Sequence, residues 1–120
     1  MKFWHNPNIS MKNNKAYLGH IYQSIERIEK YLGKSTFEQF CNDDMMAAAT
    51  VRELEIIGEA ANNLSRQFRE DNSHILWRRI IDMRNFLIHE YFGVNKKIVW
   101  QTYKNDLPQL KEFVNKFLRD

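Results

Sequence analysis

The sequence predicts an all-α protein, an antiparallel bundle of about four to six helices. Only 4 glycines and 2 prolines interrupt its 120 residues. Long stretches carry apolar residues at alternating spacings of three and four, which is the pattern of a helix with one buried face. No stretch alternates apolar and polar residues as a strand would. Short polar loops between such helices favour antiparallel neighbours.

The first helix is expected over residues 14–32 and should end at Gly33, a residue type favoured just after a helix. Its core-facing stripe would consist of Leu18, Ile21, Ile25, Ile28 and Leu32. Residues 1–13 are polar and aperiodic, which is typical of a terminal extension outside the core. The domain assignment is therefore an N-terminal extension over 1–13 and one helical domain over 14–120.

Two further helices follow from capping signals. Ser35-Thr36-Phe37-Glu38 matches a capping box, which predicts a short helix that ends near Cys41. Asp43 or Asp44 can cap the next helix, which is expected to run uninterrupted over 44–70 and to be the central element of the bundle. Its apolar seam would be Val51, Leu54, Ile57, Ala61, Leu64 and Phe68, with small residues at Gly58, Ala60 and Ala61 where another helix can approach closely.

The remaining chain predicts three helices. A fourth is expected over 75–88, after a polar break at 71–74. Asn95 should cap a fifth helix over 96–105. Asp106 and Pro108 form the start signal of a last helix, whose stripe would be Leu107, Leu110, Val114 and Phe117.

Composition limits the class of protein. The net charge of +3 indicates a mild preference for anionic partners. The single cysteine, Cys41, excludes an intrachain disulfide and a cysteine-rich zinc site. No apolar run approaches the ~20 residues of a membrane span, and the N-terminus lacks a signal-peptide core, so we expect a cytoplasmic protein with no membrane partner. The histidines are not spaced as metal ligands, so neither a metal nor a cofactor is expected.

One segment gathers residues suited to phosphodiester chemistry. Arg84 can bind a phosphate through two N–H groups, and His89 can take a proton from a ribose 2′-hydroxyl near neutral pH without a metal. Helical geometry places Asn85 and His89 on one face and Arg84 and Tyr91 on another. Arg84 and His89 therefore converge only if the helix loosens near its end or a second chain supplies half of the site. The alternative is structural, because such residues at helix ends often cap carbonyls or pair with carboxylates.

The order of these motifs resembles the HepT-like branch of the HEPN superfamily. The resemblance covers about residues 15–118. It depends on Arg84-Asn85-x-x-x-His89-x-Tyr91, on Ile56-Ile57-Gly58-Glu59-Ala60-Ala61-Asn62-Asn63-Leu64-Ser65 before it, and on Phe92-Gly93-Val94, Ile98-Val99-Trp100 and Asp106-Leu107-Pro108 after it.

The resemblance implies a homodimeric ribonuclease toxin that acts on RNA, not DNA, and is encoded beside an MntA-type minimal nucleotidyltransferase antitoxin. It implies that Arg84 and His89 are the catalytic pair, that Asn85 supports them, and that the antitoxin adenylylates Tyr91. Attached AMP would place phosphates and a base where RNA must bind.

Two residues modify this expectation. Glu90 stands where the family usually has a small residue, and its carboxylate could pair with Arg84 or repel RNA phosphate. Glu59 could hold Arg84 in place, although an ordinary ion pair explains it equally well. The alternative function is therefore a catalytically weak binding module that serves as partner and acceptor substrate of a nucleotidyltransferase.

Overall fold

The computed structural model describes the backbone of residues 7–88 and 95–120 and the side chains of residues 13–83 and 95–120. The described chain is helical and contains no strand, which confirms the predicted all-α class. Its helices are α1 (Pro7–Leu32), α2 (Phe37–Cys41), α3 (Asp44–Asn63), α4 (Arg66–Asp71), α5 (Trp77–Ile88), α6 (Lys96–Gln101) and α7 (Leu107–Arg119), with a π-helical turn over Thr102–Asp106 between the last two. None of the described helices is long and apolar enough to cross a membrane.

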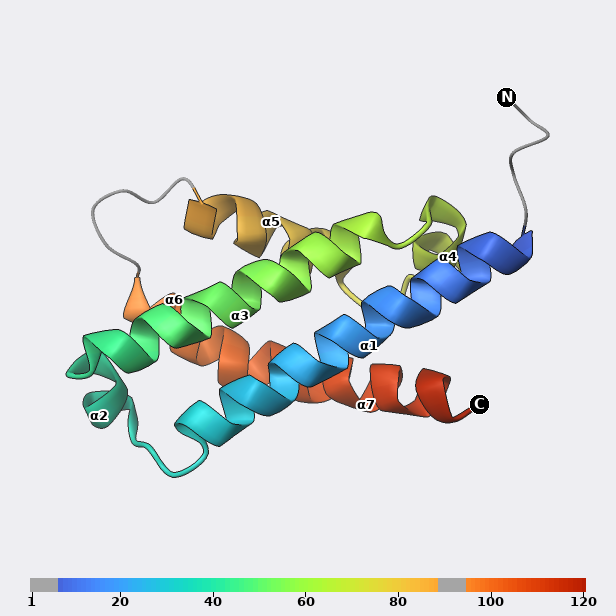
Figure 1. Ribbon diagram of the computed structural model, residues 1–120. Coiled ribbons are helices and arrows are strands. Elements are labelled where there is room, and N and C mark those ends of the chain that lie inside the picture. The colour runs from blue at the N-terminus through green and yellow to red at the C-terminus, as the bar shows by residue number, and fades with distance from the viewer. Residues whose placement is uncertain (1–6, 89–94) are drawn as a thin grey trace.

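The bundle is built around α3. This helix packs against α1 on one side and α5 on the other, while α7 packs across α1 (Figure 1). Successive long helices run in opposite directions, so the ends of α5 and α1 lie near the start of α3 (Figure 1). The end of α5, which carries Arg84 and Asn85, is thereby placed beside α3.

The predicted apolar stripe of α1 is confirmed. Its five members are at most 1% exposed, and the predicted seam over 51–68 is buried with them except for Val51, which is partly buried. Burial of each such leucine or isoleucine contributes about 1.5–3 kcal/mol. Gly58, Ala60 and Ala61 are also buried where α3 lies between its two neighbours. The small residues thus allow two helices to approach α3 closely.

The first helix begins earlier than predicted. It starts at Pro7 rather than near Asn14, and proline is compatible with the first turn of a helix. Asn14 therefore lies inside α1, where its side chain is 7% exposed. The predicted start was wrong because residues 7–13, although polar and aperiodic, continue α1 toward the N-terminus. The assignment of residues 1–13 to an extension stays a prediction.

The predicted helix over 44–70 is in fact two helices, separated at Leu64 and Ser65. Both residues are extended, with ψ of 145° and 149°. The Ser65 hydroxyl accepts from the Phe68 amide at 3.1 Å and so caps α4. The side chain of Asn14 accepts from the Ser65 amide at 3.0 Å and donates to the Ser65 hydroxyl at 3.2 Å. Hydrogen bonds from the Asn14 side chain of α1 therefore replace backbone helical hydrogen bonds at the break.

Asn14→Ala should destabilise the protein by about 1–3 kcal/mol, because it leaves the Ser65 amide without its buried acceptor. The free energy of unfolding in urea measures the effect. Asn13→Ala, at the neighbouring exposed position of α1, is the matched control and should change stability by less than about 0.5 kcal/mol. Equal stability of the two variants would contradict a locking role for Asn14.

The capping signals are partly confirmed. The capping box of α2 uses Thr36 and Gln39, one residue later than predicted: the Thr36 hydroxyl accepts from the Gln39 amide, and the Gln39 side chain accepts from the Thr36 amide. The helix ends at Cys41, as predicted. Asp43 caps α3 by accepting from the Met46 amide at 2.9 Å.

The last helix begins at Leu107 with Pro108 in its first turn, as predicted, but it is continuous with α6 through a π-helical turn. Asn95 caps α6 by accepting from the amides of Lys97 and Ile98, as predicted. The chain then passes through the π-helical turn into α7 without a break, and Asp106 keeps helical dihedrals and caps nothing. Its carboxylate instead pairs with Arg79 of α5 at 3.3 Å. Asp106, the predicted capping residue, therefore forms an ion pair with another helix instead of a cap.

Candidate functional site

The first half of the motif lies in the last turns of α5. Arg84 and Asn85 belong to this helix, which begins at Trp77 rather than at the predicted Ile75. His89 and Tyr91 lie outside the described residues, and so does Glu90. That a straight helix would separate Arg84 from His89 thus stays a prediction from the sequence.

The turn of α5 that carries Arg84 faces a particular part of α3. Met83, the preceding residue, lines a small cavity together with Leu54 and Ile57 of α3. Leu54 and Ile57 belong to the same stretch of α3 as Glu55 and Glu59, and α3 and α5 are in contact. The structure therefore brings the predicted supporting residue Glu59 and the backbone of Arg84 to adjoining helices.

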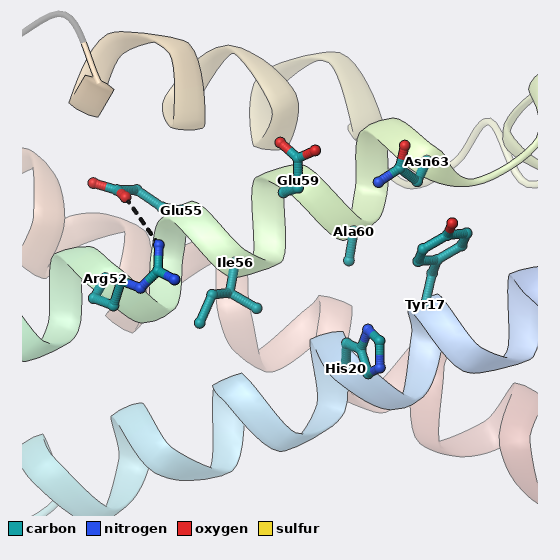
Figure 2. A pocket seen from close by; sticks show the side chains of 8 residues that line it. All are labelled: Tyr17, His20, Arg52, Glu55, Ile56, Glu59, Ala60 and Asn63. Carbon is teal, nitrogen blue, oxygen red and sulfur yellow. Dashed lines mark ion pairs between the residues drawn. The ribbon is translucent and has the colours of Figure 1, made fainter.

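The same part of α3 borders an open groove on its other side, toward α1. The groove encloses about 400 Å³ and is lined by Tyr17 and His20 of α1 and by Arg52, Glu55, Ile56, Glu59, Ala60 and Asn63 of α3 (Figure 2). The α3 residues recur at spacings of three and four and hence share one face of that helix. Glu59 lies on this face, with its carboxylate directed toward α5 (Figure 2).

The groove offers hydrogen-bonding and charged groups. The guanidinium of Arg52 lies 3.6 Å from the Glu55 carboxylate, but both are partly exposed, so the pair is weak. Tyr17 and His20 meet edge to face with ring centroids 6.3 Å apart. In the described part of the chain, no three histidine, cysteine or acidic side chains gather as a metal site would require. The groove between α1 and α3 thus presents charged and hydrogen-bonding groups.

A clamp fixes the chain just after the motif. Lys96, at the start of α6, donates to the Cys41 carbonyl and to the Asp44 carboxylate, each at 2.8 Å. The hydrogen bond and charge of Lys96 lower the pKa of Asp44, so the pair persists at neutral pH and is lost only as the pH falls through that lowered pKa. Sequence analysis missed this clamp, because Lys96 and Asp44 are 52 residues apart and no local pattern links them.

Within the described residues, the helix that carries Arg84 packs beside the helix that carries Glu59 in an all-α domain. Residues 21–117 match the family model described as "Ribonuclease HepT-like". The chain belongs to the HepT-like ribonuclease family, which confirms the resemblance seen in the sequence, and the enzyme class that this membership indicates is a ribonuclease.

Curated relatives carry corresponding names. The chain is 44% identical over 109 residues to a Caldanaerobacter subterraneus subsp. tengcongensis protein named "Putative RNase TTE0752", covering 91% of this chain and 97% of that one. It is 42% identical over 100 residues to "Probable ribonuclease HepT" of Thermococcus cleftensis, covering 83% and 91%. It is also 42% identical over 109 residues to "Gamma-glutamylcyclotransferase and putative RNase MJ0434" of Methanocaldococcus jannaschii, covering 91% of this chain and 49% of that longer protein. No solved structure matches the chain.

Proposed function

We propose that this protein is a metal-independent endoribonuclease that acts as the toxin of a toxin–antitoxin pair. The observation that carries the proposal is membership of the HepT-like family together with an intact Arg84-Asn85-x-x-x-His89-x-Tyr91 motif. Support comes from α5, which carries the first half of this motif beside α3.

The proposed reaction uses the ribose 2′-hydroxyl as its nucleophile. His89 takes the proton of this hydroxyl, whose oxygen then attacks the adjacent phosphorus. The bond from phosphorus to the 5′-oxygen breaks, which leaves a cyclic phosphate on one fragment and, after protonation, a 5′-hydroxyl on the other. Arg84 stabilises the charge that develops on the phosphoryl oxygens, and Asn85 orients His89 or a phosphate oxygen. Every atom of the reaction comes from RNA and from protons exchanged with His89 or water.

The site is proposed to form in a homodimer. On a straight helix, Arg84 and His89 face different directions, so one chain by itself does not bring them together. A second copy can supply the missing half if the two ends of α5 meet in a common cleft. Single-stranded or looped RNA fits such a cleft best, because its bases can be splayed apart.

Glu59 is proposed to position Arg84 from α3. Glu59→Gln removes the charge but keeps the shape, and should lower kcat about tenfold with little change in KM, because RNA contacts stay while the guanidinium is held less firmly. Glu55→Gln is the matched control, since Glu55 lies one turn earlier on the same face and pairs with Arg52. Steady-state cleavage of a labelled RNA measures both. Equal losses in the two variants would contradict a specific role for Glu59.

Tyr91 is proposed as the regulatory residue. A cognate nucleotidyltransferase of the MntA type would attach AMP to its phenol, and the added phosphate and base would occupy the place of RNA beside Arg84. The modification would thus silence the enzyme by imitating its substrate.

The test of the proposed function is cleavage of RNA by the purified chain in the presence of EDTA. The reaction is repeated after incubation with the adjacent nucleotidyltransferase and ATP, and the mass of the Tyr91 peptide is recorded. Cleavage that disappears as this peptide gains the mass of AMP supports both the ribonuclease activity and its regulation at Tyr91. Modified Tyr91 without any cleavage would favour the binding module, with Glu90 as the residue to replace first.

A further inference from the structure

A second cleft lies where the end of α3 and α4 meet the start of α5. It encloses about 550 Å³, and its rim carries three arginines, Arg66 and Arg69 from α4 and Arg78 from α5. Two carboxylates, Glu70 and Asp82, also line it. Arg78 and Asp82 are 3.7 Å apart with side chains 92% and 61% exposed, so their ion pair is weak and a ligand can replace it.

The start of α5 adds further donors to this cleft. The Trp77 amide bonds to the Ile75 carbonyl. Leu76 precedes the helix and has no side-chain acceptor for the first-turn amides of Arg78 and Arg79. A helix N-terminus of this kind favours negative charge. Among the described side chains, the Nε of Arg69 is buried without a hydrogen-bond partner.

Apolar side chains also line the cleft. Ile75, Leu76, Trp77 and Ile81 line it, and Leu76, at 61% exposed, presents most of its side chain to solvent. Asn62 and Ser73 supply uncharged polar groups at its edge. Apolar side chains beside guanidinium groups suit a ligand with a ring and a phosphate, and therefore a nucleotide unit.

We infer that this cleft is a binding subsite for single-stranded RNA, in which the arginines hold backbone phosphate and the exposed apolar lining, Leu76 above all, contacts one base. The inference rests on the proposed function, since it concerns the same substrate. Arg84 follows Arg78 by six residues of α5, which is about 9 Å along the helix. An RNA strand that lies along α5 would contact the subsite at one end of this helix and the cleavage motif at the other.

The experiment measures RNA binding without cleavage. In a His89→Ala background, Arg66→Ala and Arg78→Ala are combined, because both side chains are exposed and their removal leaves the core intact. Arg69 is left in place, since its Nε is buried. Lys116→Ala with Arg119→Ala, at the exposed end of α7, is the matched control with the same loss of charge. Fluorescence anisotropy with a labelled single-stranded RNA gives Kd over a range of salt concentrations.

The arginine double variant should raise Kd about 5- to 10-fold. It should also reduce the magnitude of the slope of the logarithm of the association constant against the logarithm of the salt concentration by about 1.4, the contribution of two phosphates on a single strand. The control should change both by much less. In the active enzyme, the same arginine pair should raise KM while kcat stays near that of the unmodified chain, because Arg84 and His89 are untouched.

Three outcomes separate this inference from the proposed function. Equal RNA affinity of the arginine variant and its control would overturn the subsite even if the enzyme cleaves RNA. Weaker RNA binding by the arginine variant alone would uphold the subsite even if the unmodified chain cleaves nothing. Unchanged RNA binding with loss of binding to the purified nucleotidyltransferase would overturn it too, and would assign the cleft to an acidic protein surface.

Discussion

His89→Ala is expected to abolish measurable RNA cleavage, with kcat lowered by roughly 10²- to 10⁴-fold, because the 2′-hydroxyl loses the group that takes its proton. Arg84→Ala should lower kcat by a similar roughly 10²- to 10³-fold, because charge on the phosphoryl oxygens is no longer stabilised. Both variants should also relieve growth inhibition. Cleavage of a labelled RNA, with mass spectrometry of the cyclic phosphate end, measures the effect.

The control for this prediction is His74→Ala. His74 is exposed, lies before α5 and contacts the ring of Phe113, so its loss leaves the motif intact. This variant should cleave RNA like the unmodified chain. Full activity of His89→Ala would refute the proposed catalytic role, provided that the circular dichroism spectrum shows the same helical fold.

Mixing the two inactive variants tests whether the site is shared between chains. If Arg84 from one chain acts with His89 from its partner, dimers of one Arg84→Ala chain and one His89→Ala chain contain one complete site and regain part of the activity. If each chain holds both residues of its own site, these mixed dimers stay inactive. Loosening of the helix near Gly93 would then be the remaining way for the two residues to meet.

Tyr91→Phe is expected to produce an enzyme that the nucleotidyltransferase cannot silence. Phenylalanine keeps the ring but lacks the oxygen that accepts AMP, so cleavage should continue in the presence of partner and ATP. In cells, co-expression of the partner should protect against the unmodified chain and fail to protect against the variant. Intact mass and RNA cleavage, recorded on the same samples, measure the result.

The matched control is Tyr22→Phe, which removes a phenol on α1 outside the motif. This variant should still gain AMP and lose activity. Silencing of Tyr91→Phe without any gain in mass would show that the partner inhibits by binding alone. The adenylylation proposal would then be wrong, although the ribonuclease proposal would stand.

Several elements followed from the sequence because their causes are local. The stripe of α1 follows from apolar residues three and four apart, and all five are buried. Asp43 and Asn95 cap their helices because a side-chain oxygen within three residues reaches free amides. The motif itself was visible as sequence, and the family match confirms the class of protein that it indicates.

Other features depended on contacts between distant residues. A helical seam from Val51 to Phe68 predicted one helix. Its side chains are buried as expected, except for the partly buried Val51, but Asn14 bonds to Ser65 across 51 residues where the helix divides. Asp106 stands where a capping residue is expected, yet its carboxylate forms an ion pair with Arg79 of α5. Local patterns do not show which remote partner competes for a polar group.

The sequence by itself therefore determined the all-α class, the buried faces and the motif, because helical periodicity and capping act over three to four residues. Only the tertiary structure decided where helices break, that Lys96 clamps the chain after the motif onto Asp44, and that three arginines from α4 and α5 share one cleft. These arrangements arise when side chains far apart in sequence satisfy one another's hydrogen bonds and charges as the helices pack around α3.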